Sequence, residues 1–312
     1  MSEEWFDREI VADRAETMEL SPGAPAVVVP LDGTESALTA LPVAKAMSEL
    51  LDAVLHVVHV GGRVLPPREL LRLLGLTTEQ VRGSVIDEVV DEPAAGIVRV
   101  ACDRNCQQIV MCTNTGTVET GHALGPVAER VLGTSTCPVL LVRPERALVS
   151  WEIDRVLLPH DGTPTTAAAI GPAVALASRA GAALIVLHVA IPGRARRTVE
   201  PGTMTAPQYI DQPQHEWPAW ADEFLTRLRL LGHLPPQLGL RMLLAKGEPG
   251  EETVAFAIRC QVDLIVVAWH GDLSPEHAAT MKTIIRRTPC PVLVVPFVNS
   301  HSRARARSGG CA

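Results

Sequence analysis

The chain alternates short apolar runs with longer segments whose apolar residues recur at helical spacing, and the same alternation occurs twice. Val27–Val60 reads VVVPLDGTESALTALPVAKAMSELLDAVLHVVHV, and Val156–Val189 reads VLLPHDGTPTTAAAIGPAVALASRAGAALIVLHV. Each segment predicts a buried strand, an Asp-Gly-Thr turn, an Ala- and Leu-rich helix and a second buried strand. A strand–helix–strand unit of this kind requires parallel pairing and a right-handed crossover.

The repeat extends beyond these segments. Asp91–Cys112 matches Gly247–Ala268, and both predict a turn with proline at a helix start, a helix and then a strand. The first half ends with TSTCPVLLVRP and the second with RTPCPVLVVP, so each last strand is entered through Cys-Pro, at Cys137 and Cys290. We therefore predict an α/β protein built from two copies of a five-stranded domain.

Changes in composition set the expected domain limits. Residues 1–20 are acidic and are expected to form one short helix, and proline and charge interrupt the apolar pattern between the two copies. The first domain is predicted over residues 21–148 and the second over 149–298. The second domain carries an insertion at about residues 192–218, rich in Pro, Gly, Gln and Thr, which we expect to be a loop. Residues 299–312 are expected to be a disordered basic tail.

Composition restricts the class of protein. Hydrophobic residues make up 47% of the 312 residues and aromatic residues only 3%, which is typical of an aliphatic parallel sheet covered by helices. The net charge of −7 argues against nucleic-acid and membrane-surface partners. We find no signal peptide, and the longest apolar run is too short to span a bilayer. Seven dispersed cysteines then indicate free thiols in a reducing, cytoplasmic setting.

One glycine-rich stretch could serve a ligand. TGTVETGHALGPVAERVL contains Gly116, Gly121 and Gly125 directly before a helix whose first residue is predicted to be Pro126. A glycine-rich turn that opens a helix can cradle a phosphate with its backbone amides. Proline also suits the first helical position, so a loop-to-helix connection without a ligand explains the same residues. The sequence leaves both interpretations open.

Three features together resemble the universal stress protein family in its tandem form. They are the opening strand with its Asp-Gly turn, the LHV second strand with its HVVHV counterpart, and PVAERVLGTSTCPVLLVRP. The resemblance covers about Ala26 to Phe297. It implies two Rossmann-like domains of the adenine nucleotide alpha hydrolase type, each with strand order 3-2-1-4-5. It also implies pairing through the fifth strands, here as a pseudo-dimer within one chain, with a homodimer as a further option.

The family's nucleotide signature, Gly-x2-Gly-x9-Gly followed by Ser or Thr, is not intact in the first copy. Alignment on the Cys-Pro step places Gly125 at the last glycine but Pro126 at the Ser or Thr position, so a hydroxyl and one amide donor are lost. The earlier glycine positions fall on Cys112 and Thr115. Two interpretations of the first copy therefore stay open. One is a modified phosphate or ribose site, and the other is a loop that binds no ligand.

The second copy departs further from the signature. Gly271 fits its second glycine only if the loop is shortened. Asp272 and Glu276 follow closely, and two carboxylates would repel a triphosphate. We therefore expect a degenerate nucleotide site in the second domain.

Two aspartates support a base-binding role. Asp32 and Asp161 end the first strand of their copies, where the family contacts the adenine edge. A carboxylate there can accept a hydrogen bond from the exocyclic amine. Turn formation and capping of the first helix explain both aspartates equally well.

Other chemical groups give weaker signals. Cys102 and Cys106 are expected four residues apart on one helix, where free thiols are favoured over a metal site. His160 with Asp161 could approach His270 as an acid–base or metal pair. No nucleophile elbow, P-loop or Gly-x-Gly-x-x-Gly motif is present, so we do not expect an enzyme.

These observations predict a cytoplasmic, non-catalytic stress-response module. Its first domain is expected to bind AMP, or ATP with Mg²⁺, through Asp32 and the loop from Gly116 to Gly125. An unidentified protein partner is also expected. The first alternative is an interaction scaffold that needs no nucleotide, and the second is a weak ATP hydrolase.

The repeat makes one architectural prediction. The last strands of the two copies, beginning near Val139 and Val292, should meet about a pseudo-twofold axis, because an unpaired apolar edge strand favours association. An experimental structure in which both strands are far apart and open to solvent would contradict this arrangement.

Overall fold

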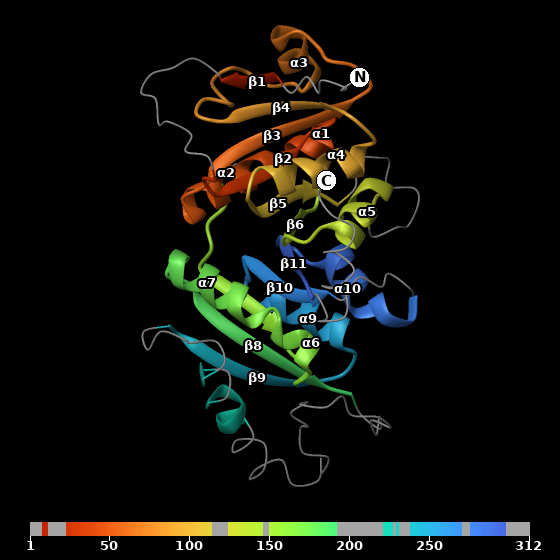
Figure 1. Ribbon diagram of the computed structural model, residues 1–312. Helices are drawn as coiled ribbons and strands as arrows, with labels where there is room; N and C mark the ends of the chain where they lie inside the picture. The colour runs from red at the N-terminus through yellow and green to blue at the C-terminus, as the bar shows by residue number, and fades with distance from the viewer. Residues whose placement is uncertain are drawn as a thin grey trace, which may run out of the picture. The chain divides into compact units, whose positions relative to one another are not determined.

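The computed structural model contains two compact units. The first comprises Met1–Ile153 with Ile285–Leu293, and the second comprises Asp154–Ile284 with Val294–Ala312 (Figure 1). The predicted insertion and tail lie outside the described residues, as does most of the acidic N-terminal segment. The structure describes residues 8–11, 23–113, 124–145, 150–191, 221–226, 229–230, 238–269 and 275–297.

The sheet of the first unit has the strand order β1-β4-β3-β2-β5-β6. Strands β2 to β6 pair in parallel, so this copy has the predicted order 3-2-1-4-5. The strands are β1 (Arg8–Val11), β2 (Ala26–Pro30), β3 (Val54–Gly61), β4 (Val85–Val90), β5 (Cys106–Cys112) and β6 (Val139–Val142).

Strand β1 corrects the prediction for the N-terminal segment. A short helix was expected there, but Arg8–Val11 pairs antiparallel with β4, with Arg8 opposite Glu88. The outer edge of β4 presents unpaired backbone N–H and C=O groups, and an extended segment satisfies them. That edge exists only after the sheet has formed, so the local sequence carried no clear signal for a strand.

Helices cover both faces of this sheet. Helix α2 packs on β2, β3 and β5, whereas α4 packs on β2 to β5 and against α5. Right-handed crossovers place α1 to α3 on one face and α4 and α5 on the other, because the strand order reverses after β4. The helices are α1 (Glu35–Leu38), α2 (Ala40–Leu51), α3 (Pro67–Leu73), α4 (Pro93–Asp103) and α5 (Pro126–Thr134).

The second unit repeats this architecture with the strand order β9-β8-β7-β10-β11, and the pairs among β7, β8, β9 and β10 are parallel. The predicted meeting of the last strands of the two copies stays a prediction. Within the described ranges, no helix is long and apolar enough to cross a membrane. The elements are β7 (Arg155–Pro159), α6 (Pro164–Ala167), α7 (Ile170–Ala180), β8 (Ala183–Ala190), β9 (Leu240–Lys246), α9 (Pro249–Arg259), β10 (Leu264–Trp269), α10 (Pro275–Arg287) and β11 (Val292–Pro296).

The Asp-Gly-Thr turn adopts one geometry in both copies. Gly33 has φ +86° and Gly162 has φ +85°, a region that residues with a Cβ rarely occupy. A Cβ on Gly33 would also lie 2.5 Å from the Leu73 carbonyl oxygen at the end of α3. Glycine is therefore required at this point, and it lets α3 pack closely against the turn.

A charged network ties the amino-terminal half of the first sheet to α4. The buried His56 Nδ1 lies 2.6 Å from Asp87 Oδ2, and Arg104 Nη2 donates to Asp87 Oδ1 at 2.6 Å. Burial alone raises the pKa of Asp87. The hydrogen bond and charge of His56, together with the Arg104 guanidinium, outweigh burial and hold the pKa of Asp87 below its ordinary value. Asp87 therefore stays charged between two donors.

We predict that Asp87→Ala destabilises the protein by about 3 kcal/mol, because it leaves two donors without their shared carboxylate. The matched control is Glu79→Ala, which removes an ion pair with Arg82 whose side chains are 72% and 74% exposed. That control should cost less than about 1 kcal/mol. Urea unfolding measures both changes, and equal losses in the two variants would contradict a structural role for Asp87.

Candidate functional site

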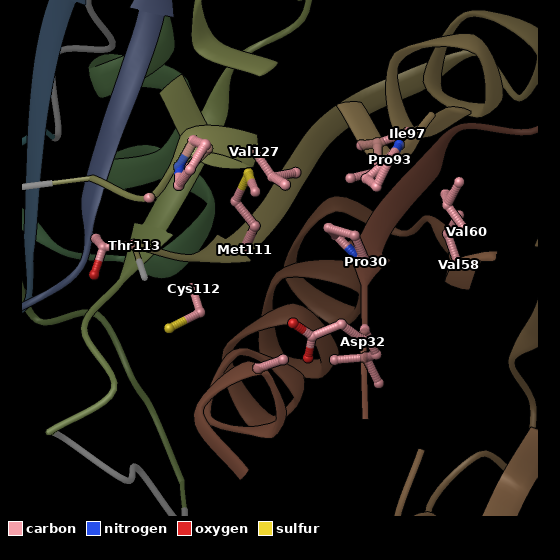
Figure 2. A pocket seen from close by; sticks show the side chains of 15 residues that line it. Pro30, Asp32, Val58, Val60, Pro93, Ile97, Met111, Cys112, Thr113 and Val127 are labelled. Carbon is pink, nitrogen blue, oxygen red and sulfur yellow. The ribbon is translucent and has the colours of Figure 1, made fainter. Parts of the chain in front are cut away.

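A cavity of about 370 Å³ opens in the first unit at the carboxyl ends of β2, β3 and β5. The strand order reverses between β2 and β5, and α/β sheets bind ligands in the crevice outside such a switch point. Figure 2 shows the lining side chains, which come from these strands and from the first turns of α1, α4 and α5. They are Pro30, Leu31, Asp32, Ala37, Val58, Val60, Pro93, Ile97, Met111, Cys112, Thr113, Gly125, Pro126, Val127 and Ala128.

Most of the cavity wall is apolar. Val58 and Val60 project from β3 and Met111 from β5, while Pro93 and Ile97 come from α4 (Figure 2). Val58 and Val60 are two residues apart and therefore share one face of the strand. An apolar cavity with few polar groups suits a flat ring such as a nucleobase better than a highly charged group.

Asp32 stands at the cavity with one carboxylate oxygen engaged. Its Oδ1 accepts from the backbone N–H of Thr34 at 2.9 Å and from the Thr34 hydroxyl at 2.7 Å. Thr34 in turn caps α1, because its Oγ1 accepts from Ala37 N at 3.1 Å. Turn formation by Asp32 is therefore confirmed, but the cap is Thr34. Within the described residues, Asp32 Oδ2 has no hydrogen-bond partner.

A histidine from the neighbouring strand fixes the strand end that carries each aspartate. His59 Nδ1 donates to the Leu31 carbonyl oxygen at 3.1 Å, and His188 Nδ1 donates to the His160 carbonyl oxygen at 3.0 Å. A carbonyl only accepts, so Nδ1 carries the proton in both rings. The Nδ1 atom of His59 therefore has a backbone partner within the sheet, and this bond helps to position Asp32.

The entry to α5 offers fewer donors than a phosphate cradle needs. Gly125 precedes the helix and Pro126 is its first residue, as predicted. The Gly125 N–H donates to the Thr113 carbonyl oxygen at 2.8 Å, and Pro126 has no N–H. The first-turn amides of Val127 and Ala128 remain, and both residues line the cavity.

Three predicted site glycines cannot be placed. Gly116, Gly121 and Gly271 lie outside the described residues. Cys112, at a signature glycine position, lines the cavity. The structure therefore brings together Asp32 and Gly125 around one cavity and places Asp161 in the other unit.

The second unit carries different residues at two positions that line the first cavity. His160 corresponds to Leu31, and Trp269 corresponds to Thr113. Both His160 and Trp269 are buried. Asp161 Oδ1 accepts from Thr163 N at 3.0 Å and from the Thr166 hydroxyl at 2.8 Å, so it forms the same kind of turn as in the first copy.

His160 is held as a neutral ring. Its Nδ1 accepts from the Gly162 N–H at 2.9 Å, and the ring lies edge-on to Phe224 with centroids 5.0 Å apart. Burial lowers the pKa of His160 to about 4. The expected partner His270 lies outside the described residues, so the acid–base pair with Asp161 stays a prediction.

The cysteines do not lie as expected. Cys102 is on α4, but Cys106 is the first residue of β5, so the predicted pair on one helix is wrong. The six cysteines in the described ranges form no disulfide. No group of three potential metal ligands occurs in this part of the chain.

Sequence reasoning missed the apolar wall of the cavity. Pro93 and Ile97 belong to α4, and only tertiary packing brings that helix beside the ends of β2 and β5. The available signal was the proline that begins α4 and its counterpart that begins α9, Pro93 and Pro249. The sequence pattern predicts only a helix start at these prolines and does not indicate that they lie near the cavity.

Comparison with known proteins supports this architecture. The family model "Universal stress protein family" matches residues 65–143 and 152–296. No curated protein sequence matches the chain.

Solved structures match over most of the chain. A universal stress protein from Archaeoglobus fulgidus DSM 4304 shares 17% identity at a TM-score of 0.58, covering 87% of this chain and 98% of that one. A universal stress protein from Pseudomonas aeruginosa UCBPP-PA14 shares 17% identity at a TM-score of 0.60, covering 88% and 94%. The fold is therefore shared along nearly the full length of both chains. With two matched segments that together span more than half of its residues, this chain belongs to the universal stress protein family.

Proposed function

We propose that the protein is a non-catalytic stress-response module that binds an adenine nucleotide, preferentially AMP, in the first unit. The observation that carries this proposal is the apolar cavity at the switch point between β2 and β5, with a carboxylate oxygen of Asp32 at its edge that no described residue engages. The adenine ring would lie between the apolar walls. Its exocyclic amine would donate to Asp32 Oδ2.

The phosphate side of the cavity favours one phosphate over three. The first-turn amides of Val127 and Ala128, with the positive end of the α5 dipole, can meet one anionic group. Pro126 supplies neither an amide nor a hydroxyl, and Gly125 N is already bonded to Thr113. Among the described residues, few donors are therefore left for the distal phosphates of ATP.

The absence of catalysis is also part of the proposal. Around the cavity, the described residues include one carboxylate, Asp32, and one threonine, Thr113, but no histidine or lysine. Hydrolysis of a phosphoanhydride requires a general base or metal positioned beside the phosphates. In this proposal Asp32, the carboxylate of the wall, lies at the adenine ring and not beside the phosphates. Binding would then act by stabilising the nucleotide-bound form of the protein.

We predict that Asp32→Asn weakens AMP binding by about 1–2 kcal/mol, the usual cost of losing a hydrogen bond to a charged group. Asparagine keeps an oxygen for the bonds to Thr34 but replaces the open carboxylate oxygen with an NH₂ donor. The matched control is Asp161→Asn, which makes the same change in the turn of the second unit. Titration calorimetry with AMP should show the loss only in the Asp32 variant. Equal affinity in both variants would refute base recognition by Asp32, and no AMP binding by the wild type would favour the nucleotide-independent scaffold.

We predict that Pro126→Ser strengthens ATP binding by about 2–4 kcal/mol, because serine restores an amide and a hydroxyl at the helix entry. The gain should be larger for ATP than for AMP, whose single phosphate already has the first-turn amides. Dissociation constants for both nucleotides with Mg²⁺ measure the difference.

The control for this change is Pro249→Ser, at the first residue of α9 in the second unit. It makes the same substitution at a helix start, so it should leave both affinities unchanged. Tight ATP binding by the wild-type protein would show that the loop is already a working phosphate cradle. No gain in the Pro126 variant would assign the defect to Cys112 and the altered glycine spacing.

A further inference from the structure

Two thiols meet at the amino-terminal edge of the first sheet, at the opposite ends of the strands from the cavity. Cys106 is the first residue of β5, and Cys137 lies two residues before β6. β5 and β6 pair in parallel with Ile109 opposite Val139. Cys106 lies three residues before Ile109 and Cys137 two residues before Val139, so the two cysteines are neighbours on adjacent strands with an offset of one residue. Each thiol has the largest single influence on the pKa of the other, so the two side chains lie within interaction distance.

The spacing suits a disulfide. Neighbouring strands are about 4.8 Å apart and one residue advances about 3.3 Å, so an offset of one residue separates the Cα atoms by roughly 6 Å. Disulfides span Cα separations of about 4.4–6.8 Å. Both side chains are only partly buried, and the adjacent Gln107 and Thr136 are exposed, so a small oxidant can reach the thiols.

The surroundings of the two sulfurs differ, which assigns a separate role to each. The hydrogen bond from Cys106 lowers the pKa of Cys137 to about 7 against the opposing effect of burial, and the Ser135 hydroxyl, 3.4 Å from the Cys137 sulfur, acts in the same direction. The hydrogen bond to Cys137 and burial both raise the pKa of the Cys106 thiol. Cys137 is thus the nucleophilic thiolate, and Cys106 keeps its proton.

We propose that Cys106 and Cys137 form a reversible dithiol–disulfide pair that a hydroperoxide oxidises. The Cys137 thiolate attacks the terminal peroxide oxygen, the O–O bond breaks, and a sulfenic acid forms. Hydroxide, or alkoxide from an organic hydroperoxide, leaves and takes up a proton. The Cys106 sulfur then attacks the Cys137 sulfur, the S–S bond forms and the S–O bond breaks. The Cys106 proton leaves with the second hydroxide as water. Two thiols and one hydroperoxide give one disulfide, one water and one further water or alcohol.

The second copy supplies a natural comparison. Cys290 occupies the position of Cys137, and Thr288 Oγ1 lies 3.3 Å from its sulfur. The corresponding distance from Ser135 Oγ to the Cys137 sulfur is 3.4 Å. The residue that corresponds to Cys106 is Val262, which has no thiol. The repeat has therefore kept the Cys-Pro strand entry in both copies, but the adjacent thiol occurs only in the first.

The test is treatment of the full-length protein with hydrogen peroxide, followed by alkylation of free thiols and peptide mapping. We expect one linked peptide pair, Cys106 with Cys137, with a mass lower by two hydrogen atoms and restored by dithiothreitol. Cys290 should remain alkylatable under the same conditions. A different linkage, or over-oxidation of Cys137 without any linkage, would overturn the proposal.

Cys106→Val is the matched variant. Valine occupies the corresponding position in the second copy, so the variant is expected to fold. It should leave Cys137 unlinked and more readily converted to sulfinic acid. The midpoint of the pH profile for Cys137 alkylation should also rise from about 7 toward the ordinary thiol value of about 8.5, so alkylation at neutral pH should slow about tenfold or more. An unchanged midpoint would show that Cys106 does not activate Cys137. Cys290→Ala should change neither the linkage nor the profile, and a loss of linkage in that variant would equally count against the pair.

Discussion

The reversal of strand order between β2 and β5 is the constraint on which the rest of the first unit depends. Crossovers between parallel strands are right-handed as a rule, so connections that run outward from β2 and those that run outward from β5 place their helices on opposite faces of the sheet. The chain leaves the carboxyl ends of these two strands in opposite directions. A crevice opens between them, and α4 and α5 form its further walls.

The internal repeat shows which features belong to the fold and which belong to the site. Both copies keep the Asp-Gly-Thr turn, the glycine at positive φ and the histidine that donates to the preceding carbonyl. These groups position the strand end whether or not a ligand binds. The cavity wall differs, because His160 and Trp269 replace Leu31 and Thr113. The groups that position the strand end are therefore present in both copies, whereas the proposed binding role is supported in only one.

The two ends of the first sheet carry different chemistry. Its carboxyl end has an apolar cavity, and its amino end has the Asp87 network and the Cys106–Cys137 pair. Asp87 and Cys137 share one physical principle. A donor held close by the fold stabilises the charged form of each group more than burial destabilises it, so the pKa falls in both cases. Such donors come from separate strands and helices, so these shifts exist only in the folded chain.

The sequence by itself determined the α/β class, the two copies, the 3-2-1-4-5 strand order implied by the family resemblance, and the helix start at Pro126. Apolar periodicity and turn residues act locally, and the repeat doubled each signal. The sequence also identified Asp32 and Gly125, because both stand at strand and helix ends. Only the tertiary structure decided that β1 is a strand, that Val60 and Ile97 share a cavity wall, and that Cys106 meets Cys137 rather than Cys102. These outcomes depend on edges and faces that distant segments create together, and no local window contains both partners.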